Sequence, residues 1–177
     1  ASALYGLAYI ANQRRDLSSA ESYLKEAQAT GVASAALDAL EVELLLGQTK
    51  FDQALQVAEQ AWKKWPQNQV IALAVVEAMQ KNRQTTAMIP FLKERLKQWP
   101  EEPRFYQLLA QALERVNQPV AAREAMADYY VRIGALSSAV DQFQQARSRS
   151  TDFHEQSTID VKIRDLRERL ERDRLLL

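Results

Sequence analysis

Apolar residues recur along most of this chain at the spacing of amphipathic helices. The stretch 51–66 shows the pattern most clearly, because its apolar positions fall three or four residues apart. One helical face there carries only methyl groups, which lets a neighbouring helix approach closely. The alanines that form this face are Ala54, Ala58 and Ala61.

The end of this stretch returns at a fixed distance. Trp65 and Pro66 close it, and Trp99 and Pro100 repeat the pair 34 residues later. A period of this length indicates an array of helical repeats. Glycine and proline mark the connections at Gly31, Gly47, Gly134 and Pro119.

These patterns predict an all-α fold of about ten helices and no strand. The predicted helices cover residues 1–13, 17–29, 33–46, 50–64, 69–81, 86–98, 102–116, 119–132, 136–148 and 152–174. The distance between matching positions falls to half a repeat after residue 119. The helix at 119–132 should therefore close one repeat and open the next.

The repeat pattern resembles the tetratricopeptide repeat, a helix pair that stacks into a solenoid. Residues 1–34 carry it as Leu4, Leu7, Ala8, Ala20, Leu24 and Ala27. The resemblance divides the chain into repeats at 1–34 and 35–68, a degenerate repeat at 69–102, and a fourth repeat with an overlapping half-repeat at 103–150. The third repeat is degenerate because Met88 replaces the small alanine of the pattern.

Residues 151–177 are predicted to form a C-terminal capping helix. One narrow apolar stripe runs along it, and its other faces are charged, as expected for a helix that covers the last repeat. The stripe consists of Ile159, Ile163, Leu166 and Leu170. The alternative is a short coiled-coil segment.

Charge and composition narrow the classes of partner. Lys plus Arg number 23 and Asp plus Glu number 23, so no basic field favours nucleic acid. No apolar run approaches the roughly 20 residues that span a membrane. The single histidine, His154, has no second histidine, cysteine or carboxylate cluster at ligand spacing. We therefore expect no catalytic residue, metal site or cofactor in this chain.

The tetratricopeptide resemblance implies a groove lined by the first helix of each pair, which binds a protein or peptide. Long amide, aromatic and charged side chains occupy the groove positions and suit such recognition; the alternative is an ordinary solvated helix face. These positions hold Tyr5, Tyr9, Asn12, Gln13, Glu43, Glu77, Gln80, Lys81, Arg104, Gln107, Gln111, Glu114 and Arg115.

One use of this groove is excluded by its residues. Family members that bind acidic C-terminal tails hold the terminal carboxylate with cations and asparagines. The matching positions here are Tyr5, Tyr9, Leu40, Val70 and Ala74. None is a cation, which argues against a cochaperone of that type.

The C-terminal part has a narrower resemblance, over about residues 119–170. The run ADYYVRIG at 127–134 and the closing-helix pairs Ile159-Asp160, Ile163-Arg164 and Leu166-Arg167 are similar to the end of BepA-like (YfgC-like) proteins. These are bacterial periplasmic zinc metalloproteases with an N-terminal peptidase domain and a C-terminal tetratricopeptide domain. Their His-Glu-x-x-His zinc motif is absent from this sequence.

The resemblance implies that this chain is the non-catalytic, partner-docking half of such a protease. Its partners would be outer-membrane proteins, the β-barrel assembly machinery or its own peptidase domain. It would be located in the periplasm and would act in the assembly and quality control of outer-membrane proteins. Zinc would belong to the absent domain. Because the chain begins directly on a repeat helix, we expect a piece of a longer protein. The alternative is a stand-alone tetratricopeptide adaptor or scaffold of the cell envelope or cytoplasm.

Overall fold

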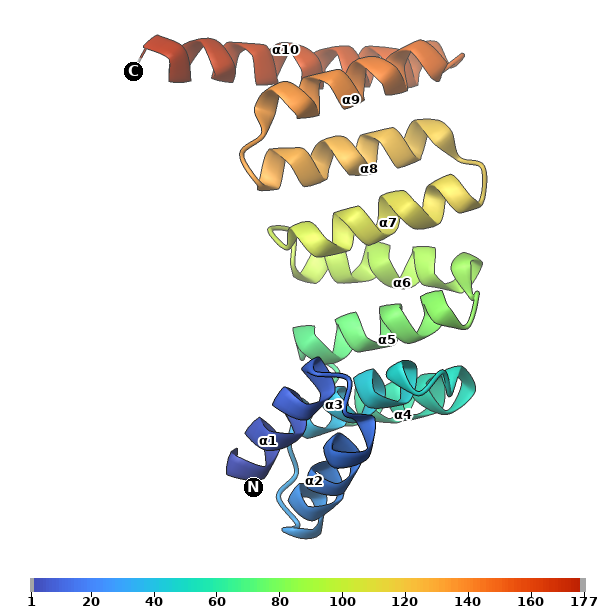
Figure 1. Cartoon of the computed structure of the whole chain (residues 1–177). Helices are drawn as coiled ribbons and strands as arrows, with labels where there is room; N and C mark the ends of the chain where they lie inside the picture. The colour runs from blue at the N-terminus through green and yellow to red at the C-terminus, as the bar shows by residue number, and fades with distance from the viewer. Residues whose placement is uncertain (1, 176–177) are drawn as a thin grey trace. The chain divides into compact units, whose positions relative to one another are not determined.

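The computed structural model describes residues 2–175 as ten α-helices without a strand. The helices are α1 (Ser2–Gln13), α2 (Leu17–Ala29), α3 (Ala35–Gly47), α4 (Phe51–Lys64), α5 (Gln69–Lys81), α6 (Thr85–Gln98), α7 (Pro103–Arg115), α8 (Pro119–Arg132), α9 (Leu136–Arg149) and α10 (Phe153–Leu175) (Figure 1). The predicted all-α fold is confirmed, with each boundary within two residues of its prediction. Ala1, in the predicted first helix, and Leu176 and Leu177, in the predicted capping segment 151–177, lie outside the described residues.

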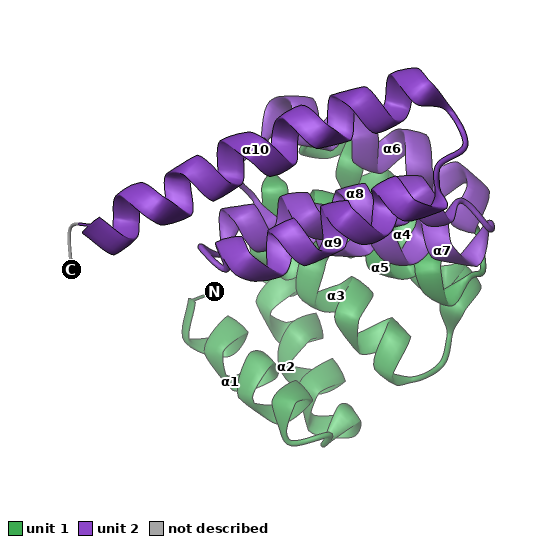
Figure 2. Ribbon diagram, turned by 90° about the horizontal axis from the view of Figure 1, so that it is seen from above, with its two compact units in different colours: residues 1–84 green, residues 85–177 purple. Residues whose placement is uncertain are grey.

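The chain forms two compact units, which Figure 2 colours separately. Unit 1 covers residues 1–84 and contains α1 to α5; unit 2 covers residues 85–177 and contains α6 to α10. The division falls between the two helices predicted for the degenerate third repeat. The repeat boundaries themselves remain predictions.

Five connections between successive helices share one backbone geometry. Each contains a residue with positive φ whose amide donates to the carbonyl three residues earlier, and the next amide donates five residues back. The residues in this conformation are Arg15, Thr49, Arg83, Asn117 and Gly134. The first four recur every 34 residues, and Gly134 follows Asn117 after half that distance. This spacing agrees with the prediction that α8 closes one repeat and opens the next, which remains a prediction.

Glycine occupies only the last of these left-handed positions. Thr49 has a φ of 59°, which is strained for a β-branched residue. Gly47, predicted to break the chain, is instead the last residue of α3. A Cβ at that position would lie 3.4 Å from the side chain of Leu17, which is about van der Waals contact, so neither a turn nor the helix packing requires glycine at position 47.

Replacing Thr49 with glycine should raise the free energy of unfolding by about 0.5–1 kcal/mol, because glycine adopts a positive φ without a steric penalty. Asn117→Gly is the matched control, and its free energy of unfolding should rise less, since asparagine tolerates a positive φ. Urea unfolding followed by circular dichroism measures both changes. A loss of stability in Thr49→Gly would contradict the strain argument.

Unit 1 is built around α3, which contacts α1, α2, α4 and α5. Alanines and leucines from α1 to α3 form one buried cluster, with small side chains where the helices approach closely. Trp65 ties the end of α4 to the start of α3, because its indole nitrogen donates to the Asp38 carboxylate at 2.7 Å. Because α1 contacts α3 and α3 contacts α5, the first helices of successive pairs lie beside one another.

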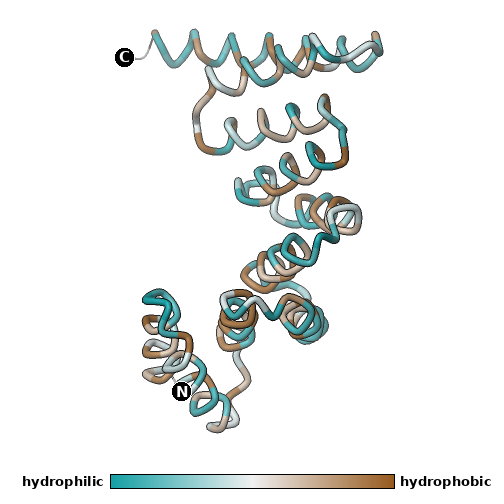
Figure 3. Tube along the Cα trace, turned by 45° about the vertical axis from the view of Figure 1, so that its right-hand side comes forward, coloured by the Kyte–Doolittle hydropathy of each residue, from teal (hydrophilic) through white to brown (hydrophobic). Residues whose placement is uncertain are grey.

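Unit 2 stacks its helices in chain order, with each one contacting the next (Figure 1). Within it, α10 places Ile159, Ile163 and Leu166 in the core formed with α8 and α9, and Leu170 packs at its edge. Figure 3 shows this long helix as mostly hydrophilic, with apolar residues at intervals. The apolar stripe predicted for the capping helix is therefore confirmed.

Asp152 begins α10 by accepting hydrogen bonds from the amides of His154 and Glu155, at 2.7 and 2.9 Å. These bonds hold the pKa of the Asp152 carboxyl below its ordinary value. Asp160 binds Arg147 of α9 at 2.5 Å. The cap is thus fixed to unit 2 by polar contacts as well as by its apolar stripe.

Candidate functional site

The candidate site lies in unit 1, on the face formed by α1, α3 and α5. Seven of the predicted groove residues line two neighbouring pockets on this face. They are Tyr5, Tyr9, Asn12, Gln13, Glu43, Glu77 and Lys81. Glu43 lines both pockets, so they adjoin at this residue, and the two together are here called the groove of unit 1.

The first pocket, here called the tyrosine pocket, has a volume of about 190 Å³. Its walls are Tyr5, Tyr9, Ala35, Ala36, Ala39, Leu40, Glu43, Asn68 and Val70. The two tyrosines lie one turn apart on α1, with ring centroids 6.2 Å apart and planes 23° apart. The alanines at the start of α3 leave the space beside these rings open.

Among the described residues that line the tyrosine pocket, Glu43 alone is charged. It is half-buried, and its carboxylate accepts a hydrogen bond of 3.4 Å from the side-chain amide of Asn12. Burial raises the pKa of the Glu43 carboxyl, and the negative charge of Glu77 adds to the rise. Within residues 2–175, no basic side chain forms an ion pair with it.

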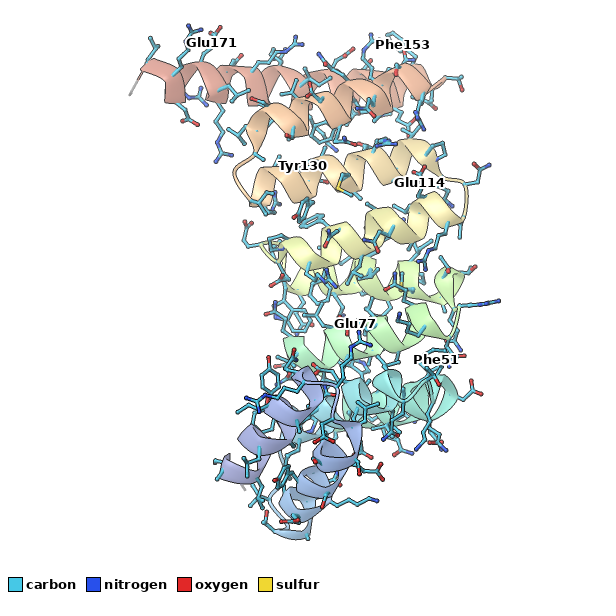
Figure 4. All side chains as sticks on the ribbon, viewed as in Figure 1. Phe51, Glu77, Glu114, Tyr130, Phe153 and Glu171 are labelled. Carbon is cyan, nitrogen blue, oxygen red and sulfur yellow. The ribbon has the colours of Figure 1, made fainter. Side chains whose placement is uncertain are left out.

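The second pocket, here called the polar pocket, is larger and has a volume of about 630 Å³. Charges of both signs line it, from Arg15, Glu43, Glu77 and Lys81. Glu77 projects from the middle of α5, and Phe51 marks the start of α4 (Figure 4). The other lining residues are Asn12, Gln13, Leu17, Leu46, Gly47, Thr49 and Phe51.

The other predicted groove residues line neither the tyrosine pocket nor the polar pocket. Gln80 lies on α5 but lines neither of these pockets. In unit 2, Gln111 and Glu114 line a pocket of about 260 Å³ with Arg123 and Met126 of α8. Arg104 donates to Gln107 at 3.0 Å on the surface of α7. Arg115 is an exposed residue at the end of the same helix. A binding role for these residues remains a prediction.

Sequence reasoning did not assign Leu40, Asn68 or Val70 to a binding site. Val70 is 55% exposed although it is apolar, and it stands at a position that faces the groove in tetratricopeptide repeats. A valine at a groove-facing repeat position could therefore have indicated a binding role for Val70. Asn68 gave no such indication, because its side chain also caps α5 by accepting the amide of Ile71 at 3.1 Å.

Among residues 2–175, no three histidine, aspartate or glutamate side chains are grouped so that they could hold a metal ion. None of the helices in the same residues has the length and apolar character to cross a membrane.

No family model and no curated protein matches this sequence. Solved structures do match it. One is MamA (41-end) from Desulfovibrio magneticus RS-1, with 18% identity and a TM-score of 0.66 over 97% of this chain and 95% of that one. A MamA RS-1 ArsTM double mutant gives 16% identity and a TM-score of 0.67, over 96% of this chain and 95% of that one. For MamA MSR-1 the identity is 12% and the TM-score is 0.60, over 92% of this chain and 93% of that one. At these identities the likeness shows the fold alone, an all-α tetratricopeptide-type helical solenoid.

Proposed function

We propose that this chain is a protein-interaction module that binds a segment of another protein in the groove of unit 1. The observation that carries the proposal is that α1, α3 and α5 place two pockets side by side, joined at Glu43. Aromatic, amide and charged side chains line them, a mixture suited to recognising a polypeptide.

The sizes of the two pockets indicate the form of the bound segment. The tyrosine pocket, at about 190 Å³, is smaller than sites for drug-sized ligands, which measure roughly 300–1,000 Å³. It suits one side chain. The polar pocket, at about 630 Å³, can take the adjoining residues with their backbone groups. An extended segment would place successive residues in the two pockets.

We further propose that the module is the docking half of a periplasmic zinc metalloprotease that acts in outer-membrane protein assembly and quality control. The resemblance of residues 119–170 to BepA-like proteins supports this assignment. Its partners would then be outer-membrane proteins, the β-barrel assembly machinery or its own peptidase domain. The competing proposal is a stand-alone adaptor or scaffold of the envelope or cytoplasm. The repeats of unit 1 are generic and are equally compatible with this role.

Photocrosslinking tests both the binding of a protein in the groove and the assignment to a periplasmic protease. A photoreactive residue is placed at Tyr9, Glu77 or Gln111, and at Lys25 as a control, because Lys25 is exposed on α2 away from the groove pockets. In an envelope extract, Tyr9 and Glu77 should capture a protein that Lys25 does not. Capture of outer-membrane proteins or their assembly factors would support the protease half. Equal capture at Lys25 would contradict a groove-based function.

A further inference from the structure

We propose that the tyrosine pocket binds the guanidinium group of an arginine in the partner segment. This inference rests on the proposed function, since it names the side chain by which the groove would recognise its partner. Its three elements are the paired tyrosine rings, the apolar wall and the carboxylate of Glu43.

The tyrosines provide a surface for a flat cation. Tyr5 and Tyr9 are stacked at 6.2 Å and both line the pocket. Tyr9 is 43% exposed, so part of its ring remains open to a ligand. A guanidinium that lies over a tyrosine face is attracted by the ring's quadrupole, and the attraction grows as water is excluded.

The apolar wall suits the stem of a long cationic side chain. Leu40, Val70 and the three alanines of α3 lie beside the rings. Arginine buries its methylene groups along such surfaces while its charge reaches a polar group. Here the polar group is Glu43.

Glu43 supplies the matching charge. Its carboxylate is half-buried, accepts a hydrogen bond from Asn12, and forms no ion pair within residues 2–175. A carboxylate in this position is destabilised by burial and by the like charge of Glu77. A bound cation would offset both effects by placing an opposite charge beside the carboxylate. The basic residues of the groove, Arg15 and Lys81, line the polar pocket and not the tyrosine pocket.

Arginine fits this pocket better than lysine does. Its planar group stacks on aromatic rings and can donate two parallel hydrogen bonds to one carboxylate, whereas an ammonium group is a strongly hydrated point charge. A neutral side chain would bury Glu43 further without compensating its charge. An acidic side chain would add a third negative charge next to Glu43 and Glu77.

Peptide pools test the assignment with the full chain immobilised. Each pool contains nine-residue peptides with random flanks and one fixed central residue, which is arginine, lysine, glutamate or citrulline. Citrulline is the control for arginine because it has nearly the same shape without the charge. The arginine pool should be retained about tenfold more than the citrulline pool.

Variants locate the preference in this pocket. Glu43→Gln should remove the difference between arginine and citrulline, because glutamine keeps the size of glutamate but not its charge. Glu59→Gln, at an exposed glutamate of α4 that lines neither groove pocket, should leave the difference unchanged. Tyr9→Leu gives an independent check at a partly exposed position and should reduce retention of the arginine pool.

The outcomes separate this inference from the proposed function. If arginine and citrulline pools are retained equally, the inference is overturned while groove binding stands. Equal retention of the lysine and arginine pools would overturn the assignment to a guanidinium. If no pool is retained more than on a Tyr5→Ala/Tyr9→Ala chain, both the inference and the proposed function fail.

Discussion

Replacing Phe105 with alanine should lower the free energy of unfolding by about 3–5 kcal/mol, the range for removing a buried phenylalanine ring from a packed core. Phe105 lies on α7 and is fully buried. Its ring stacks on Trp99, with centroids 5.7 Å apart and planes 20° apart. The variant would lose both the buried area of the ring and this aromatic contact.

The matched control is Phe153→Ala. Phe153 is 83% exposed at the start of α10, so the same change of residue type should alter stability by no more than about 0.5 kcal/mol. Urea unfolding followed by circular dichroism measures both variants, and tryptophan fluorescence reports the loss of the ring beside Trp99. Equal effects at the two positions would contradict the buried placement of Phe105.

The helices could be predicted from the sequence because local rules decide them. Alanine-rich faces, the Trp-Pro pairs and the half-period after residue 119 identify the helices and their order. The roles of the two tryptophans could not be predicted in the same way. Trp65 donates to Asp38, 27 residues earlier, whereas Trp99 stacks on Phe105, six residues later. These partners depend on how neighbouring helices pack.

The backbone conformation of the turns could also be predicted only in part from the sequence. Sequence reasoning expects glycine at breaks, and Gly134 meets this expectation with a φ of 77°. Arg15, Thr49 and Arg83 adopt the same left-handed region without being glycine. Arginine and threonine therefore occupy the turn position that glycine occupies at Gly134, so residue type alone does not reveal this conformation.

The candidate site was predictable where it follows the repeat register. Register placed Tyr5, Tyr9 and Glu43 on the groove side, and they line one pocket. It could not show that the alanines of α3 leave space beside the rings, or that Glu43 forms no ion pair within the described residues. Both facts depend on side chains from separate helices. The chemical selectivity of the pocket therefore emerges only in three dimensions.

Replacing Ala54 with leucine should destabilise the chain by about 1–3 kcal/mol through overpacking. Ala54 lies on α4 with no exposed surface, and Ala58 on the same face is equally buried. Interiors at this packing density have no space for three additional carbon atoms. The extra atoms would force neighbouring side chains off their preferred rotamers or push α4 away from α3 and α5, its contacts in unit 1.

Ala87→Leu is the control for this substitution, because Ala87 is an exposed residue of α6. Leucine and alanine are both good helix formers, so the control should stay within about 0.5 kcal/mol of the parent chain. Thermal and urea unfolding of both variants provide the comparison. Parent-like stability of Ala54→Leu would show that α4 does not pack through its small residues, and the repeat register assigned to this helix would then be wrong. A loss confined to Ala54→Leu is expected instead, because only a closely approached helix face is sensitive to the added volume.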